Sequence, residues 1–248
     1  MEPIIEVNNV HKTYRKASEE ALKGVSLKIA PGEFFGLLGP NAAGKTTLIS
    51  MICGLLKISA GTIRIKGFDI STSYSPVKPL IGLIPQEIAL YPTLTVRENL
   101  MFFGDMYGIS GKNLEQRVEE CLDVVGLKPH AKKRVSICSG GIKRRANLVA
   151  GLMHKPEILF LDEPTLGVDT QSMNLIYEYL KKLNNEGTTI IYTTHYMKEA
   201  ENLCSRINII DDGVIISNGT PQALIAGTPG CSDLGQVFIK LTGRELRD

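Results

Sequence analysis

The chain has 248 residues, a net charge of +2 and a mean hydropathy close to zero. This length allows one large domain or two small ones with a substantial core. The small net charge gives no reason to expect a nucleic-acid partner. No run of about 18 apolar residues occurs, so we expect no membrane-spanning helix.

The N-terminus and the cysteines indicate the cellular compartment. Residues 1–6 are acidic and lack the basic and then apolar pattern of a signal peptide. The five cysteines are widely spaced, and no two of them form a Cys-x-x-Cys pair. An odd, scattered set favours reduced thiols, most of them packed as small core residues. We therefore expect a cytoplasmic protein.

The first 70 residues alternate short apolar runs with turns rich in Gly, Pro and Lys. Residues 4–7, 25–29 and 61–67 have the composition and alternation of strands. We predict that they form a small antiparallel sheet beside the loop described next.

A phosphate-binding motif follows a short apolar run at residues 33–38. The motif has the pattern G-x-x-x-x-G-K-[ST] and reads Gly39-Pro40-Asn41-Ala42-Ala43-Gly44-Lys45-Thr46. Its glycines let backbone N–H groups curl around phosphate, Lys45 supplies a charge, and the Thr46 hydroxyl can bind Mg²⁺. Residues 47–52 read as a helix, which would place the phosphates at a helix N-terminus. The alternative is a plain glycine-rich turn.

Residues 95–155 are predicted to form a helical insertion. Residues 95–107 look helical, and apolar residues recur at helical spacing between residues 114 and 125. Gly126 is a plausible stop for this second helix. Ser139-Gly140-Gly141 then precedes another helix, whose first turn carries Lys143, Arg144 and Arg145. Cations there oppose the helix dipole and suggest a second anion site. The alternative is a capped helix with a solvated basic face.

An acidic pair follows a buried strand about 120 residues after the phosphate loop. Residues 158–161 are apolar on both faces, as in a parallel strand covered by helices. Asp162 would lie at the ligand-binding edge of the sheet, where it could hold Mg²⁺. Glu163 could then polarise an attacking water. An isolated acidic pair would instead read as a solvated strand end.

The remaining chain is predicted to continue as α/β structure. Residues 173–184 read as a helix, and residues 188–194 as a β-branched strand. Residues 207–210 and 214–217 read as a hairpin around Asp211-Asp212-Gly213. Residues 234–241 have helical spacing.

Six motifs occur in the order and spacing of the ATP-binding cassette (ABC) ATPases, which the chain resembles over nearly its whole length. They are the phosphate loop, Gln86 in Ile84-Pro85-Gln86-Glu87, Ser139-Gly140-Gly141, Asp162-Glu163-Pro164-Thr165, Gly167-Val168-Asp169 and Thr194-His195. The resemblance implies an α/β fold: a P-loop NTPase (RecA-like) core, a small antiparallel β subdomain and an α-helical insertion. It also implies a head-to-tail dimer, in which ATP lies between the phosphate loop of one protomer and the Ser-Gly-Gly of the other.

The resemblance assigns roles to individual residues. Tyr14 matches the aromatic that stacks on adenine, and Asp169 matches the loop that couples the two sites. Glu163 matches the catalytic base, and His195 matches the histidine that contacts the γ-phosphate. Gln86 matches the residue that contacts Mg²⁺ and the attacking water and senses the membrane partner. Taken alone, Tyr14 would more often be a packing residue, Gln86 an ordinary surface residue, and His195 a structural histidine.

Three sets of site residues follow from the motifs and the resemblance. The expected catalytic set is Glu163, His195, Gln86 and Lys45. The expected Mg²⁺ ligands are Thr46, Gln86 and Asp162. The expected ATP-binding set is Tyr14, Gly39, Pro40, Asn41, Ala42, Ala43, Gly44, Lys45, Thr46, Thr47, Ser139, Gly140, Gly141 and Asp169.

Two residues depart from the family pattern. Ala42 stands where the family often has Gly, and it would cost on the order of 1 kcal/mol if the position needs a positive φ. Cys138 stands where Leu usually precedes Ser-Gly-Gly, and it is smaller but still apolar. Neither change removes a catalytic group, so we expect at most slower or differently regulated turnover.

Residues 91–100 and 237–244 resemble the drug-resistance and multidrug-export subfamily. This resemblance implies an ATP-hydrolysing subunit, peripheral on the cytoplasmic face of the membrane, that powers export through a separate permease. The ATPase dimer could be homomeric or heteromeric. We expect an ABC ATPase domain over residues 1–230, with its helical subdomain at about 95–155, and a helical tail over residues 231–248. The alternatives are a non-transport ABC ATPase acting on ribosomes, DNA or cluster assembly, and a nucleotide-sensing module without turnover.

Overall fold

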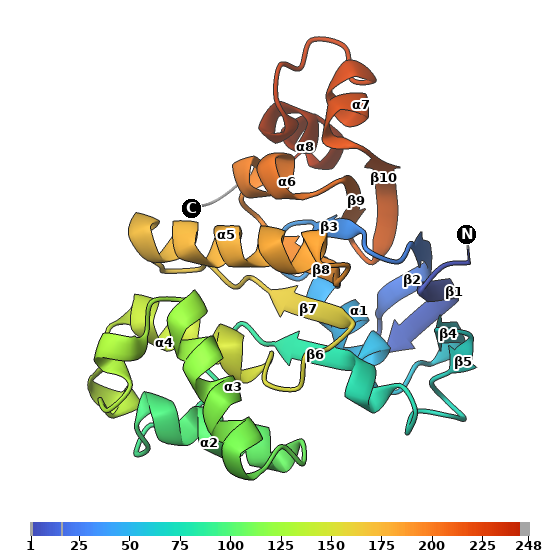
Figure 1. The fold of residues 1–248 in the computed structure, drawn as a ribbon. Coiled ribbons are helices and arrows are strands. Elements are labelled where there is room, and N and C mark those ends of the chain that lie inside the picture. Colours follow the sequence, from blue (N-terminus) through green and yellow to red (C-terminus); the bar gives the residue numbers. More distant parts are fainter. Residues whose placement is uncertain (1, 16, 244–248) are drawn as a thin grey trace.

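A mixed β-sheet forms the centre of the computed structural model, which describes residues 2–15 and 17–243 (Figure 1). Its strands, in their order across the sheet, are β10 (Val214–Gly219), β9 (Arg206–Asp211), β3 (Phe34–Leu38), β8 (Thr189–Thr194), β7 (Ile158–Asp162) and β6 (Ile81–Ile84). All neighbours are parallel except β9 and β10, which form the predicted hairpin. The strand β6 was not predicted from the sequence.

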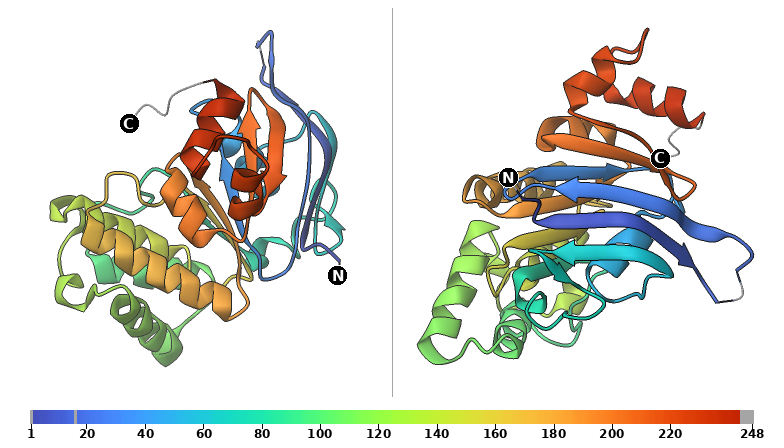
Figure 2. Two further views of the ribbon diagram at one scale, coloured as in Figure 1. Left: turned by 90° about the horizontal axis from the view of Figure 1, so that it is seen from above. Right: turned by 90° about the vertical axis from the view of Figure 1, so that its right-hand side faces the viewer.

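A second, antiparallel sheet lies on one side of the first, as the right-hand view of Figure 2 shows. Its strands, in order, are β2 (Glu20–Ile29), β1 (Ile5–Thr13), β4 (Ala60–Ile65) and β5 (Phe68–Asp69). This sheet confirms the predicted antiparallel sheet, although β1 and β2 are longer than the apolar runs that predicted them.

The helices were predicted with mixed success. They are α1 (Lys45–Ile52), α2 (Val96–Met106), α3 (Gly111–Val124), α4 (Gly140–Ala150), α5 (Thr170–Asn185), α6 (Met197–Leu203), α7 (Pro221–Ala226) and α8 (Leu234–Thr242). Single 3-10 turns lie at Lys78–Leu80, Lys128–His130 and Val135–Ile137. The short helices α6 and α7 were missed, because each is too short to show a helical period.

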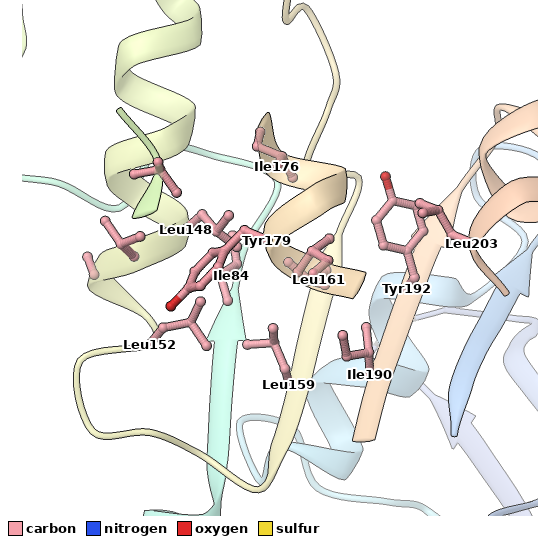
Figure 3. Packing of buried hydrophobic residues seen from close by; sticks show 14 of the residues in the cluster. Ile84, Leu148, Leu152, Leu159, Leu161, Ile176, Tyr179, Ile190, Tyr192 and Leu203 are labelled. Atoms are coloured by element: carbon pink, nitrogen blue, oxygen red, sulfur yellow. The ribbon is translucent and has the colours of Figure 1, made fainter. Parts of the chain in front are cut away.

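Alternate residues of the central sheet serve two separate hydrophobic cores. In β7, Leu159 and Leu161 pack in a core with the helices, whereas Ile158 and Phe160 pack in a core with α1 and the antiparallel sheet. Figure 3 shows Leu159 and Leu161 on the side of the sheet where Tyr179 of α5 also lies. Burial on both faces explains the continuous apolar run of this strand. It also fixes the strand's carboxyl end, where the acidic pair follows.

The helices α2, α3 and α4 pack together in the region of the predicted insertion (Figure 1). Thr95 and Glu98 form a reciprocal capping box at the start of α2. The apolar face of α3 is buried, and Gly126 takes a φ of +63° just after that helix. The limits of this insertion as a subdomain remain a prediction.

Near the end of the described chain, α8 confirms the helical spacing seen in residues 234–241. Leu234, Val237 and Phe238 are buried, whereas Leu241 is exposed. The predicted tail also included residues 244–248, which lie outside the described residues. The boundary predicted at residue 230 remains a prediction.

The described helices are all too short or too polar to cross a membrane. All five cysteines are free, and four of them are buried, as the sequence predicted. Burial raises the pKa of the Cys121 thiol to about 11, so this thiol stays protonated at neutral pH.

Candidate functional site

The phosphate loop connects β3 to α1 and borders a cavity of about 330 Å³. Gly44 precedes α1 with a φ of +105°, and a methyl group there would lie 2.9 Å from the carbonyl oxygen of Ala21. Glycine is therefore required on both conformational and steric grounds. The cavity is lined by Ala21, Asn41, Ala42, Ala43, Gly44, Lys45, Thr46, Thr47, Gln86 and Glu163.

Lys45 is the cation of this cavity. Its side chain is buried, and Nζ donates to the carbonyl oxygens of Gly39 at 2.7 Å and Pro40 at 3.0 Å. Burial lowers the pKa of the Lys45 ammonium, and the nearby carboxylates of Glu163 and Asp162 oppose that shift. The two carboxylates therefore favour the charged form of Lys45, which phosphate recognition requires.

Ala42 adopts the left-handed conformation in which alanine is less stable than the glycine that the family often has. Its φ is +65°, and the residue is exposed. An L-residue in this region costs about 1–2 kcal/mol more than glycine does.

We expect Ala42→Gly to raise the free energy of unfolding by up to about 1 kcal/mol, because relief of strain exceeds the added entropy of the unfolded chain. Urea unfolding measures this change. Ala43→Gly is the matched control, since Ala43 is buried and has no positive φ, and it should be destabilising. An equal decrease in the free energy of unfolding in both variants would contradict the strain at Ala42.

The acidic pair lies at the carboxyl end of β7, next to β8. Asp162 pairs in register with Thr193, whose hydroxyl donates to Oδ1 of Asp162 at 2.6 Å. The backbone N–H of Glu163 donates to the same hydroxyl at 3.0 Å. Glu163 has a φ of +47° although it precedes Pro164, and residues before proline normally adopt extended conformations. Strain of this kind persists only where the surroundings enforce it, and it is concentrated at functional sites.

The carboxylate of Glu163 is the meeting point of the predicted catalytic set. Its Oε1 lies 3.2 Å from Nδ1 of His195 and 3.8 Å from Nζ of Lys45. Its Oε2 accepts a hydrogen bond from Nε2 of Gln86 at 3.3 Å. His195 is close enough for an ion pair when protonated, although Nδ1 is out of line for a hydrogen bond. Three residues from three separate segments therefore converge on one buried carboxylate.

The residues predicted to hold Mg²⁺ also lie together. The Thr46 hydroxyl donates to Oδ2 of Asp162 at 2.8 Å, and Gln86 lines the same cavity as Thr46. Among residues 2–15 and 17–243, no cluster of three or more His, Cys, Asp and Glu side chains could hold a metal by itself. A hydroxyl and a single carboxylate suit Mg²⁺, which keeps several waters and takes phosphate oxygens as ligands. The donor set therefore fits this cation.

Tyr14 follows β1 and reaches the end of the phosphate loop. Its hydroxyl lies 3.0 Å from Oγ1 of Thr47, and the residue is 43% exposed. The ammonium of Lys12 lies 5.4 Å from the ring centroid. An exposed aromatic face thus stands beside the cavity, where a base attached to the bound phosphates could reach it.

Ser139-Gly140-Gly141 begins α4 and does not belong to the lining of the phosphate-loop cavity. Ser139 caps the helix, and both Ser139 and Gly140 are exposed. A methyl group on Gly141 would lie 2.5 Å from Oδ2 of Asp169, so this helix end packs directly on the start of α5. The backbone N–H of Ser172 holds the pKa of Asp169 below its usual value. The two predicted motifs therefore adjoin each other and present an exposed face.

Two of the three cations in the first turn of α4 are buried and bind backbone oxygens. Arg144 is buried and donates to the carbonyl oxygens of Gln86 and of Leu166. Arg145 is buried and donates to the carbonyl oxygen of Val125 at 2.6 Å. These guanidiniums satisfy backbone oxygens of neighbouring segments. Contact of the three cations with a bound anion remains a prediction.

Thr193 and Arg144 are functional neighbours that the sequence did not reveal. Thr193 holds both acidic residues, and Arg144 fixes the backbone at Gln86. A threonine within a β-branched strand and an arginine in a basic helix carry no sequence signal of their own.

The chain also matches known proteins. A sequence model described as "ABC transporter" matches residues 22–166, and a second, described as an AAA domain, matches residues 137–198. The first of these covers more than half of the chain and contains the phosphate loop and the acidic pair. The chain belongs to the ABC transporter family.

Curated relatives of this ABC protein include export and resistance proteins. A linearmycin resistance ATP-binding protein of Bacillus subtilis is 50% identical over 96% of this chain and 75% of its own length. A Nod factor export ATP-binding protein of Paraburkholderia xenovorans is 44% identical over 96% of this chain and 77% of its own length.

Solved structures of ABC proteins share its fold. An ATP-binding subunit of an ABC transporter superposes with a TM-score of 0.86 at 27% identity, covering 96% of this chain and 99% of the other. A dimeric cassette bound to ADP and Pi in a post-hydrolysis state superposes with a TM-score of 0.80 at 30% identity, covering 87% of this chain and 98% of the other. These matches confirm the predicted fold class and the family resemblance.

Proposed function

We propose that this ABC protein binds and hydrolyses ATP and powers export through a separate membrane permease. The observation that carries the proposal is the convergence of Lys45, Gln86 and His195 on the carboxylate of Glu163, at the edge of the phosphate-loop cavity. The names of the relatives, which include resistance and export proteins, favour export as the direction.

The geometry supports a simple assignment of steps. Backbone N–H groups of the phosphate loop and the charge of Lys45 hold the phosphates in place. Glu163 accepts a proton from a water whose oxygen attacks the γ-phosphorus, and the bond from that phosphorus to the bridging oxygen breaks to leave ADP. Gln86 and His195 fix the Glu163 carboxylate. When bound at Thr46 and Asp162, Mg²⁺ supplies neutralising charge on the phosphate oxygens.

A second cassette completes the site in this proposal. Ser139 and Gly140 are exposed, and they do not line the cavity of their own chain. The N-terminus of α4 can receive the γ-phosphate held by another copy or by a paralogue. The dimeric cassette with ADP and Pi, which superposes on this chain, supports such an assembly.

The exposed ring of Tyr14 is proposed to stack on adenine. We expect Tyr14→Ala to weaken ATP binding on the order of tenfold, because a stacked base contributes about 1–3 kcal/mol. Tyr14→Phe should bind nearly as the wild type does, since it loses only the hydroxyl near Thr47. Titration with a fluorescent ATP analogue measures both variants. Tyr91→Ala is the control, because Tyr91 is an equally exposed tyrosine elsewhere. Equal affinities of Tyr14→Ala and the control would contradict the stacking.

The permease is proposed to bind near Gln86 and α2. Tyr91 and Phe102 stack edge to face with ring centroids 4.8 Å apart, and both are exposed, as is Met106. Contiguous exposed aromatic side chains mark an interaction surface, and these follow the segment that contains Gln86.

The proposed function is tested with the purified chain and with membranes. Phosphate release from Mg-ATP should be measurable, and the chain should be retained on membranes only when its permease is co-expressed. Phe102→Asp should abolish this retention and leave ATP binding intact. ATP hydrolysis together with co-sedimentation of the chain with ribosomes or DNA would instead favour a non-transport ATPase. Tight ATP binding without phosphate release would favour a sensing module.

A further inference from the structure

Glu199 is a buried carboxylate that the proposed reaction has not used. It lies in the first turn of α6 and is 8% exposed. Within the described residues, the side-chain groups that bind it are hydroxyls and none is a cation. A buried charge without a counter-ion needs strong hydrogen bonds to be tolerated.

Four hydroxyl groups supply these hydrogen bonds. Oε1 accepts from Thr165 at 2.7 Å and from Tyr177 at 2.6 Å. Oε2 accepts from Tyr192 at 2.9 Å and from Thr194 at 2.8 Å. Burial and the hydrogen bond to Glu199 raise the pKa of Tyr177, which keeps this phenol protonated as a donor. All four groups therefore point their protons at one side chain.

Two of the four donors belong to the segments that carry reacting groups. Thr165 stands two residues after Glu163, and Thr194 immediately precedes His195. The other two donors come from α5 and from the middle of β8, and Figure 3 shows Tyr192 beside Leu203 of α6. Through these hydrogen bonds, the carboxylate of Glu199 connects the segment after β7 to the carboxyl end of β8.

The segments that carry Glu163 and His195 both need a fixed position for the reaction. Glu163 is strained at a φ of +47°, and its carboxylate works only where His195 and Gln86 meet it. Thr193 holds the backbone of Glu163 from one side. The bond from Thr165 to Glu199 holds the chain just beyond it. A displacement of about 1 Å in such a site can lower a rate roughly a hundredfold.

We propose that Glu199 is a positioning residue for ATP hydrolysis, which fixes Glu163 and His195 against each other through Thr165 and Thr194. This inference rests on the proposed ATPase function. Glu199 contacts no reacting atom itself and acts only through the two threonines.

The first test replaces Glu199 with Gln. The shape is kept, but the amide offers one acceptor oxygen in place of two. We expect kcat for Mg-ATP to fall between about tenfold and a hundredfold, with KM within about twofold of the wild-type value. Glu201→Gln is the matched control on the same helix, and its kinetics should match the wild type. Wild-type turnover in Glu199→Gln would overturn the proposal.

A second comparison separates positioning from a general structural role and does not depend on Glu199→Gln folding. Thr165→Val and Tyr177→Phe each remove one hydrogen bond to Oε1 of Glu199. Positioning predicts a larger loss of kcat in Thr165→Val, because only Thr165 belongs to the segment of Glu163. Equal losses of kcat would overturn the proposal.

A double-mutant cycle with His195→Ala completes the test. If Glu199 acts through Glu163 and His195, Glu199→Gln should cost much less turnover in the His195→Ala background than in the wild type. If Glu199→Gln lowers kcat by the same factor in both backgrounds, the positioning role is overturned, whereas the proposed ATPase function stands. A wild-type protein that releases no phosphate would overturn the proposed function, and this inference with it.

Discussion

Replacement of Glu163 with Gln is expected to lower kcat for ATP hydrolysis by a factor of about 10²–10⁴ and to leave ATP binding intact. Positioned general bases contribute on this order, and an amide cannot accept the proton of the attacking water. The fold should survive, because Gln keeps the contact with Gln86, and Asp162 still balances the charge of Lys45. Phosphate release and nucleotide titration together measure the two effects.

The other end of the same strand offers a control for this variant. Glu157 directly precedes β7 and forms an exposed ion pair with Lys66 at 2.7 Å. Exposed pairs contribute about 0–1 kcal/mol, so Glu157→Gln should hydrolyse ATP at the wild-type rate. Rapid turnover by Glu163→Gln would show that another group accepts the proton, and the assignment of Glu163 would be withdrawn.

Complementation between two inactive chains is expected to restore ATP hydrolysis. Lys45→Ala removes the cation of the phosphate loop, and Ser139→Glu places a negative charge where the proposed dimer presents a γ-phosphate. Each variant alone should be inactive. In a mixed head-to-tail dimer, one site combines the intact phosphate loop of one chain with the intact Ser-Gly-Gly of the other.

The size of the recovery can be stated for a homodimer. In an equal mixture about half of the dimers are mixed, and each has one intact site, which gives roughly a quarter of the wild-type rate if sites act independently. Ser139→Glu should still bind ATP as a monomer, because Ser139 does not line its own cavity. Lys132→Glu controls for a charge change before α4. A mixture no faster than its components would argue against the shared site.

The local chemistry of the site was predictable because it depends on residues that are adjacent in sequence. The phosphate loop needs Gly44 at a φ of +105° directly before Lys45, and the apolar run before Asp162 identifies a buried strand. The resemblance to the family also raised the question of strain at Ala42, because the family often has Gly at this position. The φ of +65° then answered it.

Interactions between distant segments were not predictable in the same way. Arg145 donates to the carbonyl oxygen of Val125, 20 residues away, and nothing in its sequence neighbours indicated this partner. Glu199 lies in α6, which is too short to show a helical period, and its donors come from segments up to 34 residues away. Such partners are brought together only by the packing of α5 and α6 on the sheet.

The exposed position of Ser139, outside the cavity of its own chain, has a consequence for energy use in the cell. On the proposed head-to-tail assembly, a dilute chain hydrolyses almost no ATP, and its rate rises with the square of its concentration. A permease that holds two copies side by side raises their effective concentration by tethering. ATP hydrolysis would then begin when the subunits assemble at the membrane, and unassembled subunits would hydrolyse little ATP.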